Sequence, residues 1–382
     1  MKKNILAIAC GIIFSLCLFI FLEFFAHSLL NSALPAGGPP AVPMKGPLLA
    51  KYKFALPTSL AMKIKTPPHY KAQRFGMKPD PSYFHFYRKQ MINDLTSAQP
   101  NFRGLIRGVL PNKEEIYKIK VSTDENGYRI WPEGPKNLTK RKKHIIFMGC
   151  SYTWGAAIND SETFISKINA STKETTAYNR GFMGEGPTDT LKKIRTLHLI
   201  DHISQPQGIA AYVFMYDHIK RALGAMSVIG RWHTFPTVAE EIEPGKFETY
   251  QRFDQTRPLW TFFMQLLSKS NILQYYSVDF PILTYSHFQW FARLIKNIET
   301  EYYVRYGKNN QFVFIFFPER PYFTAPLKAA LEEQHIQYLD YTHEWAPDAL
   351  VGEAGLIEYD GHPTAKVHKV FADMLIQDLH IK

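Results

Sequence analysis

One serine in this sequence directly follows a short apolar run that ends at a glycine. The run spans His144–Gly149, and Cys150 and Ser151 come immediately after it. This pattern predicts a buried strand whose end places Ser151 on a turn, where its hydroxyl could act as a nucleophile. A hydroxyl is a weak nucleophile, so such a site also needs a base that takes up its proton.

A candidate base lies near the end of the chain. His362 stands in the sequence Asp360-Gly-His-Pro363, ahead of a helical pattern over residues 363–380. Proline suits the first position of a helix, so His362 should lie in a fixed loop directly before that helix.

Other roles remain open for the residues at this strand end. A serine at a strand–helix junction is commonly a helix N-cap, so Ser151 could cap the following turn. Cys150 is the other potential nucleophile. Neighbouring side chains on a turn point in different directions, which disfavours Cys150 if Ser151 faces the base.

The pattern from about residue 144 predicts the elements that would position these groups. Short apolar runs alternate with helical patterns, which is typical of a parallel sheet covered by helices on both faces. Functional residues in such sheets gather at the carboxyl ends of the strands, where Ser151 is expected. The expected strands are 144–149, 177–181, 209–216, 312–318 and 336–341, and the expected helices are 161–169, 187–201, 284–306, 322–334 and 363–380.

Three stretches of the chain resemble the sequence blocks of the SGNH (GDSL-like) hydrolase superfamily. They occur in the order that the family has, within residues 144–382. The resemblance implies a flavodoxin-like three-layer α/β/α fold with a parallel central sheet. The matching stretches are Gly149-Cys-Ser151-x-Thr-x-Gly155, with cysteine where aspartate is commonest, then Asn179-x-Gly-x-x-Gly184, and finally Asp360-x-His362-Pro363.

The resemblance also implies a role for each of these residues. Ser151 would be the nucleophile, His362 its general base, and Asp360 the residue that orients the base. The backbone N–H groups of Ser151 and Gly184 would bind the oxyanion, and Asn179 belongs to the same substrate-binding block. A glycine at 184 would let its N–H approach the reacting carbonyl without obstruction from a Cβ. Such a site needs no cofactor, and we expect no metal.

Two departures from the family pattern affect the expected activity. Asp360 precedes His362 by two positions where the family usually has three. Three arrangements are then open: Asp360 still contacts the His362 ring, Glu358 takes its place, or Ser151 and His362 act as a dyad without a carboxylate. The family's third block contains an asparagine that donates to the oxyanion, whereas residues 214–218 read Phe-Met-Tyr-Asp-His. His218 could supply the missing donor. Loss of one such donor costs roughly 10²–10³ in rate.

The N-terminus predicts where the protein resides. Ile5–Leu22 carries no charge and would span roughly 27 Å as a helix, close to the thickness of a bilayer core. Lys2 and Lys3 precede this run, and no Lys or Arg follows until Lys45. The positive-inside rule then predicts a single-pass signal anchor in the cytoplasmic membrane with the rest of the chain outside the cytoplasm. A cleaved signal peptide is the alternative.

The remaining sequence divides around the expected catalytic domain. Residues 218–283 interrupt the alternation of strands and helices with an aromatic-rich insertion, either a lid over the site or an appendage with its own core. The expected divisions are a transmembrane anchor over 1–30, a Pro/Gly/Ala-rich linker over 31–50, an elaboration with a β-hairpin over 51–143, and the SGNH-like domain over 144–382.

Composition limits the range of partners. The chain of 382 residues is 46% hydrophobic and 14% aromatic, as expected of a globular protein. Its formal charge of +11 includes the run Lys140–Lys143, which we interpret as a turn before a strand, and no nucleic-acid-binding motif accompanies it. The expected substrate is an acylated envelope polysaccharide or, second, a lipid ester, with the membrane contacted through the N-terminal helix.

The function predicted from these observations is that of a serine esterase outside the cytoplasmic membrane. Two alternatives belong to other classes. The missing asparagine and the short Asp–His spacing are compatible with a non-catalytic domain that binds glycan or assists envelope assembly. An O-acyltransferase component would need the same Ser151 and His362, so the sequence cannot separate transfer from hydrolysis.

Overall fold

The structure, a computed structural model, describes most of the chain beyond residue 99. The described residues are 100–109, 115–201, 203–231, 235–276, 278–318, 324–342, 355–357 and 360–381. The expected anchor over 1–30 and linker over 31–50 lie outside them. In this part of the chain, no helix is both long enough and apolar enough to cross a membrane.

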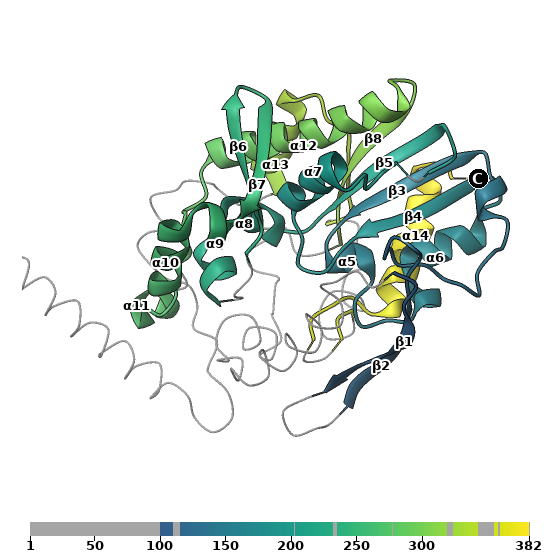
Figure 1. Ribbon diagram of the computed structural model, residues 1–382, viewed down its shortest axis with the longest axis horizontal. Coiled ribbons are helices and arrows are strands. Elements are labelled where there is room, and N and C mark those ends of the chain that lie inside the picture. The colour runs from purple at the N-terminus through teal and green to yellow at the C-terminus, as the bar shows by residue number, and fades with distance from the viewer. Residues whose placement is uncertain are drawn as a thin grey trace, which may run out of the picture.

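Five parallel strands form the central sheet (Figure 1). Their spatial order is β4-β3-β5-β8-β9, which is the order 2-1-3-4-5 of flavodoxin-like folds. The strand order reverses between β3 and β5, and ligands of such sheets bind beside the carboxyl ends of the two strands at this switch point. The strands are β3 (Lys143–Gly149), β4 (Thr175–Gly181), β5 (Gln207–Phe214), β8 (Gln311–Phe316) and β9 (Tyr338–Asp340).

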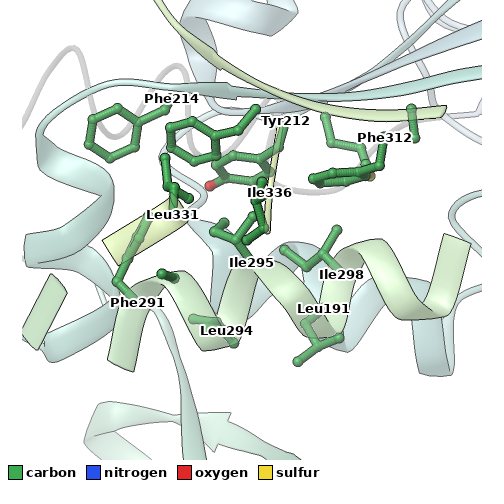
Figure 2. Packing of buried hydrophobic residues seen from close by; sticks show 14 of the residues in the cluster. Leu191, Tyr212, Phe214, Phe291, Leu294, Ile295, Ile298, Phe312, Leu331 and Ile336 are labelled. Atoms are coloured by element: carbon green, nitrogen blue, oxygen red, sulfur yellow. The ribbon is translucent and has the colours of Figure 1, made fainter. Parts of the chain in front are cut away.

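In the described residues, four helices cover one face of the sheet. Successive side chains of a strand point to opposite faces, so Tyr212 and Phe214 of β5 both turn to this side. Figure 2 shows them packed with Phe291 and Ile295 of the long helix α12. The helices on this face are α7 (Pro187–Thr196), α8 (Asp217–Leu223), α12 (Tyr285–Tyr306) and α13 (Thr324–Glu333).

Three further helices of the part of the chain that the structure describes cover the opposite face. Phe147 of β3 lies there against Phe164, which in turn contacts Phe371 with ring centroids 4.9 Å apart. These helices are α5 (Ser151–Trp154), α6 (Phe164–Ser171) and α14 (Ala365–Asp378). The structure thus confirms the prediction of a parallel sheet with helices on both faces. Pro363, expected to open the last helix, instead lies before it and pairs with Leu356.

The aromatic-rich insertion has a small core of its own. Met226, Ile229, Val238, Phe253 and Met264 are buried together, away from the two faces of the sheet. This is the packing that an appendage requires, and a role as a lid stays a prediction. The insertion contains a π-helical turn (Ser227–Arg231), β6 (Thr237–Glu243), β7 (Lys246–Arg252), α9 (Phe253–Thr256), α10 (Pro258–Leu267) and α11 (Asn271–Tyr275).

An antiparallel hairpin precedes the sheet. Its strands are β1 (Arg103–Val109) and β2 (Glu115–Ser122). In the sequence, residues 116–121 and 127–130 flank the turn-forming residues Asp124-Glu-Asn-Gly, so these two runs are expected to form the hairpin of the 51–143 elaboration. That turn exists, with a bridge between Thr123 and Arg129, but the main partner of β2 is β1. Short 3-10 turns occupy Leu138–Lys140 and Asp160–Glu162.

Two arginines between the hairpin and β3, Arg129 and Arg141, are buried. Arg141 belongs to the basic run, which does form the turn before β3, yet its guanidinium donates to the backbone oxygens of Thr175 and Asn169. The Arg129 guanidinium pairs with Asp160, with Nε 3.0 Å from Oδ1 and both side chains 2% exposed. Burial lowers the pKa of Arg129 and raises that of Asp160, so each charge depends on the other.

Breaking this buried pair should destabilise the fold strongly. Arg129→Met leaves the Asp160 carboxyl buried without its partner, and we expect the free energy of unfolding to fall by about 3–5 kcal/mol. Chemical denaturation measures this loss. Lys369→Met, which breaks the exposed pair of Lys369 with Asp373, is the control and should change stability by less than about 1 kcal/mol. Equal losses in the two variants would contradict the prediction.

Candidate active site

The end of β3 places Ser151 at the switch point of the sheet. Gly149 has φ +149°, and a Cβ there would lie 2.4 Å from Thr153 Oγ1 and 2.7 Å from the backbone oxygen of Val213. Only glycine fits this approach, so the strand can turn sharply. Cys150 is extended, and Ser151 is the first residue of the single helical turn α5. The expected exit from strand to turn is therefore present.

Ser151, His362 and Asp360 form one hydrogen-bonded chain. The distance from Ser151 Oγ to His362 Nε2 is 2.9 Å, and the distance from His362 Nδ1 to Asp360 Oδ1 is 2.5 Å. An ionised carboxylate can only accept, so with Asp360 ionised Nδ1 carries the imidazole proton and Nε2 is left to accept from the serine. This arrangement can withdraw the proton from Oγ as the serine attacks a carbonyl carbon.

The short Asp–His spacing does not keep the carboxyl from the base. Asp360 Oδ1 accepts from the backbone N–H of His362 at 3.2 Å as well as from its ring. The Asp360 side chain is fully buried, while that of His362 remains 15% exposed. Of the three possibilities that the sequence left open, contact with Asp360 is the one observed. Glu358 lies outside the described residues.

Two backbone N–H groups, those of Ser151 and Gly184, come from the segments that follow the carboxyl ends of the neighbouring strands β3 and β4. Gly184 lies between β4 and α7 with φ +75°, and a Cβ built on it would meet nothing within 4 Å. In the described residues, neither Ser151 N–H nor Gly184 N–H donates to another protein group. Arg221 holds Glu185, the residue after Gly184, in place, because its Nη1 donates to the Glu185 backbone oxygen at 2.7 Å. Such free donors are what a developing oxyanion requires.

Asn179 occupies a different place from the one expected. Its side chain is buried, and its Nδ2 donates to the backbone oxygens of Thr153 at 3.3 Å and Trp154 at 3.2 Å. Its Oδ1 accepts from Gly181 N–H. These bonds use the amide to join β4 to the end of α5, so the expectation that it binds substrate is corrected to a supporting role.

His218 does not reach the rim. Its ring is fully buried between Tyr212 and Phe214, with Nδ1 3.0 Å from the Tyr212 hydroxyl. Burial lowers its pKa well below the ordinary value, so the ring is neutral. The expectation that His218 replaces the missing oxyanion donor is therefore corrected, because its side chain points into the core. Tyr216 stands at the position of the missing asparagine and is itself buried.

Cys150 is a poor nucleophile in this setting. Its thiol is buried and lies 3.2 Å from Met215 Sδ. Burial raises the pKa of the thiol, which keeps it protonated. No group of three or more His, Cys, Asp or Glu side chains in the described ranges is arranged to hold a metal ion.

Comparisons with known proteins find similarities of structure only. No family model matches the chain, and no curated protein matches it. A lipolytic G-D-S-L protein from Veillonella parvula is 13% identical, over 62% of this chain and 97% of its own, with a TM-score of 0.33. A lipase/acylhydrolase from Enterococcus faecalis is 11% identical, over 62% of this chain and 95% of its own, with a TM-score of 0.34. An acetyl xylan esterase from Geobacillus stearothermophilus is 10% identical, over 63% of this chain and 96% of its own, with a TM-score of 0.34. At such TM-scores, these similarities do not indicate an activity for this chain.

Glu185, beside Gly184, has a carboxyl pKa far from its ordinary value. Burial raises its pKa to about 7, against the opposing effect of its ion pair with Lys193. A carboxyl whose pKa is raised by folding adds stability at low pH and loses that contribution as pH rises through about 7. The loop that carries Gly184 therefore gains a negative charge on a partly buried side chain near neutral pH.

Glu185→Gln should remove this dependence on pH. Between pH 5 and pH 8, we expect the free energy of unfolding of the wild type to fall relative to Glu185→Gln by on the order of 2 kcal/mol. Denaturation curves at pH 5, 6, 7 and 8 measure the difference. The exposed Glu243→Gln variant should follow the wild type, and parallel curves for the wild type and Glu185→Gln would refute the prediction.

Proposed function

We propose that this protein is a serine ester hydrolase of the SGNH type. The observation that carries the proposal is the chain of hydrogen bonds from Ser151 Oγ through the His362 ring to Asp360 Oδ1. The two free N–H groups of Ser151 and Gly184 add the second requirement of acyl transfer, which is a place for the oxyanion. A domain that only bound glycan would need neither feature.

The reaction follows from these positions. Ser151 Oγ attacks the ester carbonyl carbon while His362 Nε2 accepts its proton, and the carbonyl oxygen becomes an oxyanion held by the two N–H groups. The protonated imidazole then gives its proton to the leaving alcohol, which leaves an acyl-serine. Water, activated by the same imidazole, attacks that ester, and the proton returns to Ser151 as the acid departs.

The proposed location and substrate rest on the N-terminal sequence. An uncharged run over Ile5–Leu22 after two lysines would tether the domain outside the cytoplasmic membrane. A tethered enzyme meets polymers and lipids of the envelope, so we propose an O-acylated polysaccharide as substrate, with a lipid ester as second choice. Transfer of the acyl group to a sugar hydroxyl would use the same residues, and product analysis with an acceptor glycan separates it from hydrolysis.

Ser151→Ala is the first test of this proposal. Removal of the nucleophile should lower the turnover of an aryl acetate by at least about 10³-fold. The control is Ser227→Ala, which removes a hydroxyl bonded to Asp279 in the insertion and should leave turnover unchanged. Wild-type protein that turns over no ester, or Ser151→Ala that keeps full activity, would rule out the proposal.

A second test concerns the oxyanion site. Gly184→Ala places a Cβ in open space but strains a backbone at φ +75°, so the N–H should move and kcat should fall by about 10²-fold. Gly245→Ala carries the same strain at φ +76°, also with no neighbour within 4 Å, but in the β6–β7 turn. Steady-state kinetics and thermal unfolding of both variants compare the two. Equal kcat values would exclude Gly184 from the site.

A further inference from the structure

The chain between Asp360 and His362 makes an unusually tight turn. Only Gly361 separates the two, and its φ of +79° is a conformation that other residues rarely adopt. Ile357 closes the turn: its N–H donates to the His362 backbone oxygen at 2.8 Å, and its own oxygen accepts from Gly361 N–H at 2.9 Å. The left-handed glycine is what allows Asp360 to reach His362 across the shortened spacing.

Tyr152, the residue after the serine, contacts this turn twice. Its hydroxyl donates to the Gly361 backbone oxygen at 3.1 Å. Its ring meets the His362 imidazole edge to face, with centroids 5.6 Å apart, and is backed by Phe317 at 5.1 Å. Tyr152 is 7% exposed, and its hydrogen bond to Gly361 is partly buried.

These contacts restrict the tilt of the His362 ring, which the hydrogen bond to Asp360 alone does not prevent. A hydrogen bond at Nδ1 holds one side of the imidazole, but the ring can still tilt about that bond and carry Nε2 away from Ser151. The Tyr152 ring blocks that tilt, and its hydroxyl holds the backbone from which His362 extends. Because Tyr152 follows Ser151 on α5, nucleophile and base are held by the same helical turn.

We propose that Tyr152 and Gly361 are positioning residues that adapt the site to its short Asp–His spacing. Gly361 provides the turn, and Tyr152 locks it against the helical turn that carries Ser151. Neither residue takes part in bond making; both act through His362. This inference rests on the proposed function for its kinetic consequences, but not for its structural ones.

Kinetics of the full-length protein test the first part. Tyr152→Phe removes only the hydroxyl, and kcat for an aryl acetate should fall about 5–10-fold with KM unchanged. Tyr152→Leu also removes the ring, and kcat should fall about 10²-fold. The control is Tyr306→Phe, which removes a hydroxyl bonded to the Ile200 backbone oxygen at the opposite end of the sheet. Unchanged kcat in both Tyr152 variants would overturn the proposal.

A double-mutant cycle shows whether Tyr152 acts through His362. With His362→Ala as the starting point, Tyr152→Phe should have no further effect on the rate at which a fluorophosphonate labels Ser151. A residue that contacted substrate independently would keep its full effect there, and that result would overturn the assignment.

Nuclear magnetic resonance of histidine labelled with nitrogen-15 gives a readout that needs no turnover. The signals lost in His362→Ala identify this ring, and in the wild type they should show a proton on Nδ1 and an accepting Nε2. Tyr152→Phe and Gly361→Ala should convert this pattern into a mixture of tautomers. Tyr306→Phe and Gly307→Ala, whose glycine has φ +82° and open space around it, should not.

The combined outcomes separate the two proposals. A tautomer change in a protein that hydrolyses no ester would support the positioning role and refute the proposed function. Ester turnover with an unchanged His362 spectrum and unchanged kcat in Tyr152→Phe would refute the positioning role alone. If Gly361→Ala fails to fold, the Tyr152 variants decide the question by themselves.

Discussion

The position of Ser151 depends on how the carboxyl end of a single helical turn is held. Four residues make too few internal hydrogen bonds to be stable alone, so α5 needs partners for its last carbonyls. Asn179 donates to the oxygens of Thr153 and Trp154. Arg129 donates to those of Trp154 and Gly155, and also to that of Ile158 at 2.6 Å. The amide of Asn179 from β4 and the guanidinium of Arg129 thus hold the carboxyl end of α5 in place.

This support explains why residues before the sheet matter to the site. Arg129 precedes β3 and is buried with Asp160, which follows α5, while Ile119 and Val121 of β2 pack on Trp154. A guanidinium buried in this way is costly unless its donors are used, and here Asp160 and three backbone oxygens use them. The segment that the sequence suggested as an elaboration therefore contributes directly to the geometry around Ser151.

The sequence predicted those features that depend on local pattern. The runs that became β3, β4, β5, β8 and β9 were visible because buried parallel strands are continuously apolar, and the meeting of Ser151 with His362 followed from their shared rim. What it missed depends on contacts far apart in the chain. Asn179 fits its sequence block equally well as a substrate ligand or as a partner of α5, and only its neighbours decide between them. Tyr152 gave no signal, because an aromatic residue after a serine is ordinary until the turn at Gly361 lies beside it.

The two departures from the family pattern have opposite physical consequences. The short spacing between Asp360 and His362 is compensated in full, because a left-handed Gly361 brings the carboxyl to the ring and Tyr152 secures the turn. The missing asparagine is not replaced by His218, which is neutral and faces the core. Within the described residues, the donors proposed for an oxyanion are the two backbone N–H groups, and loss of a third donor costs roughly 10²–10³ in rate. The proposed hydrolase would therefore have a well-placed base, and its oxyanion stabilisation would limit the rate. For such an enzyme, activated esters with good leaving groups should be turned over more readily than unactivated ones.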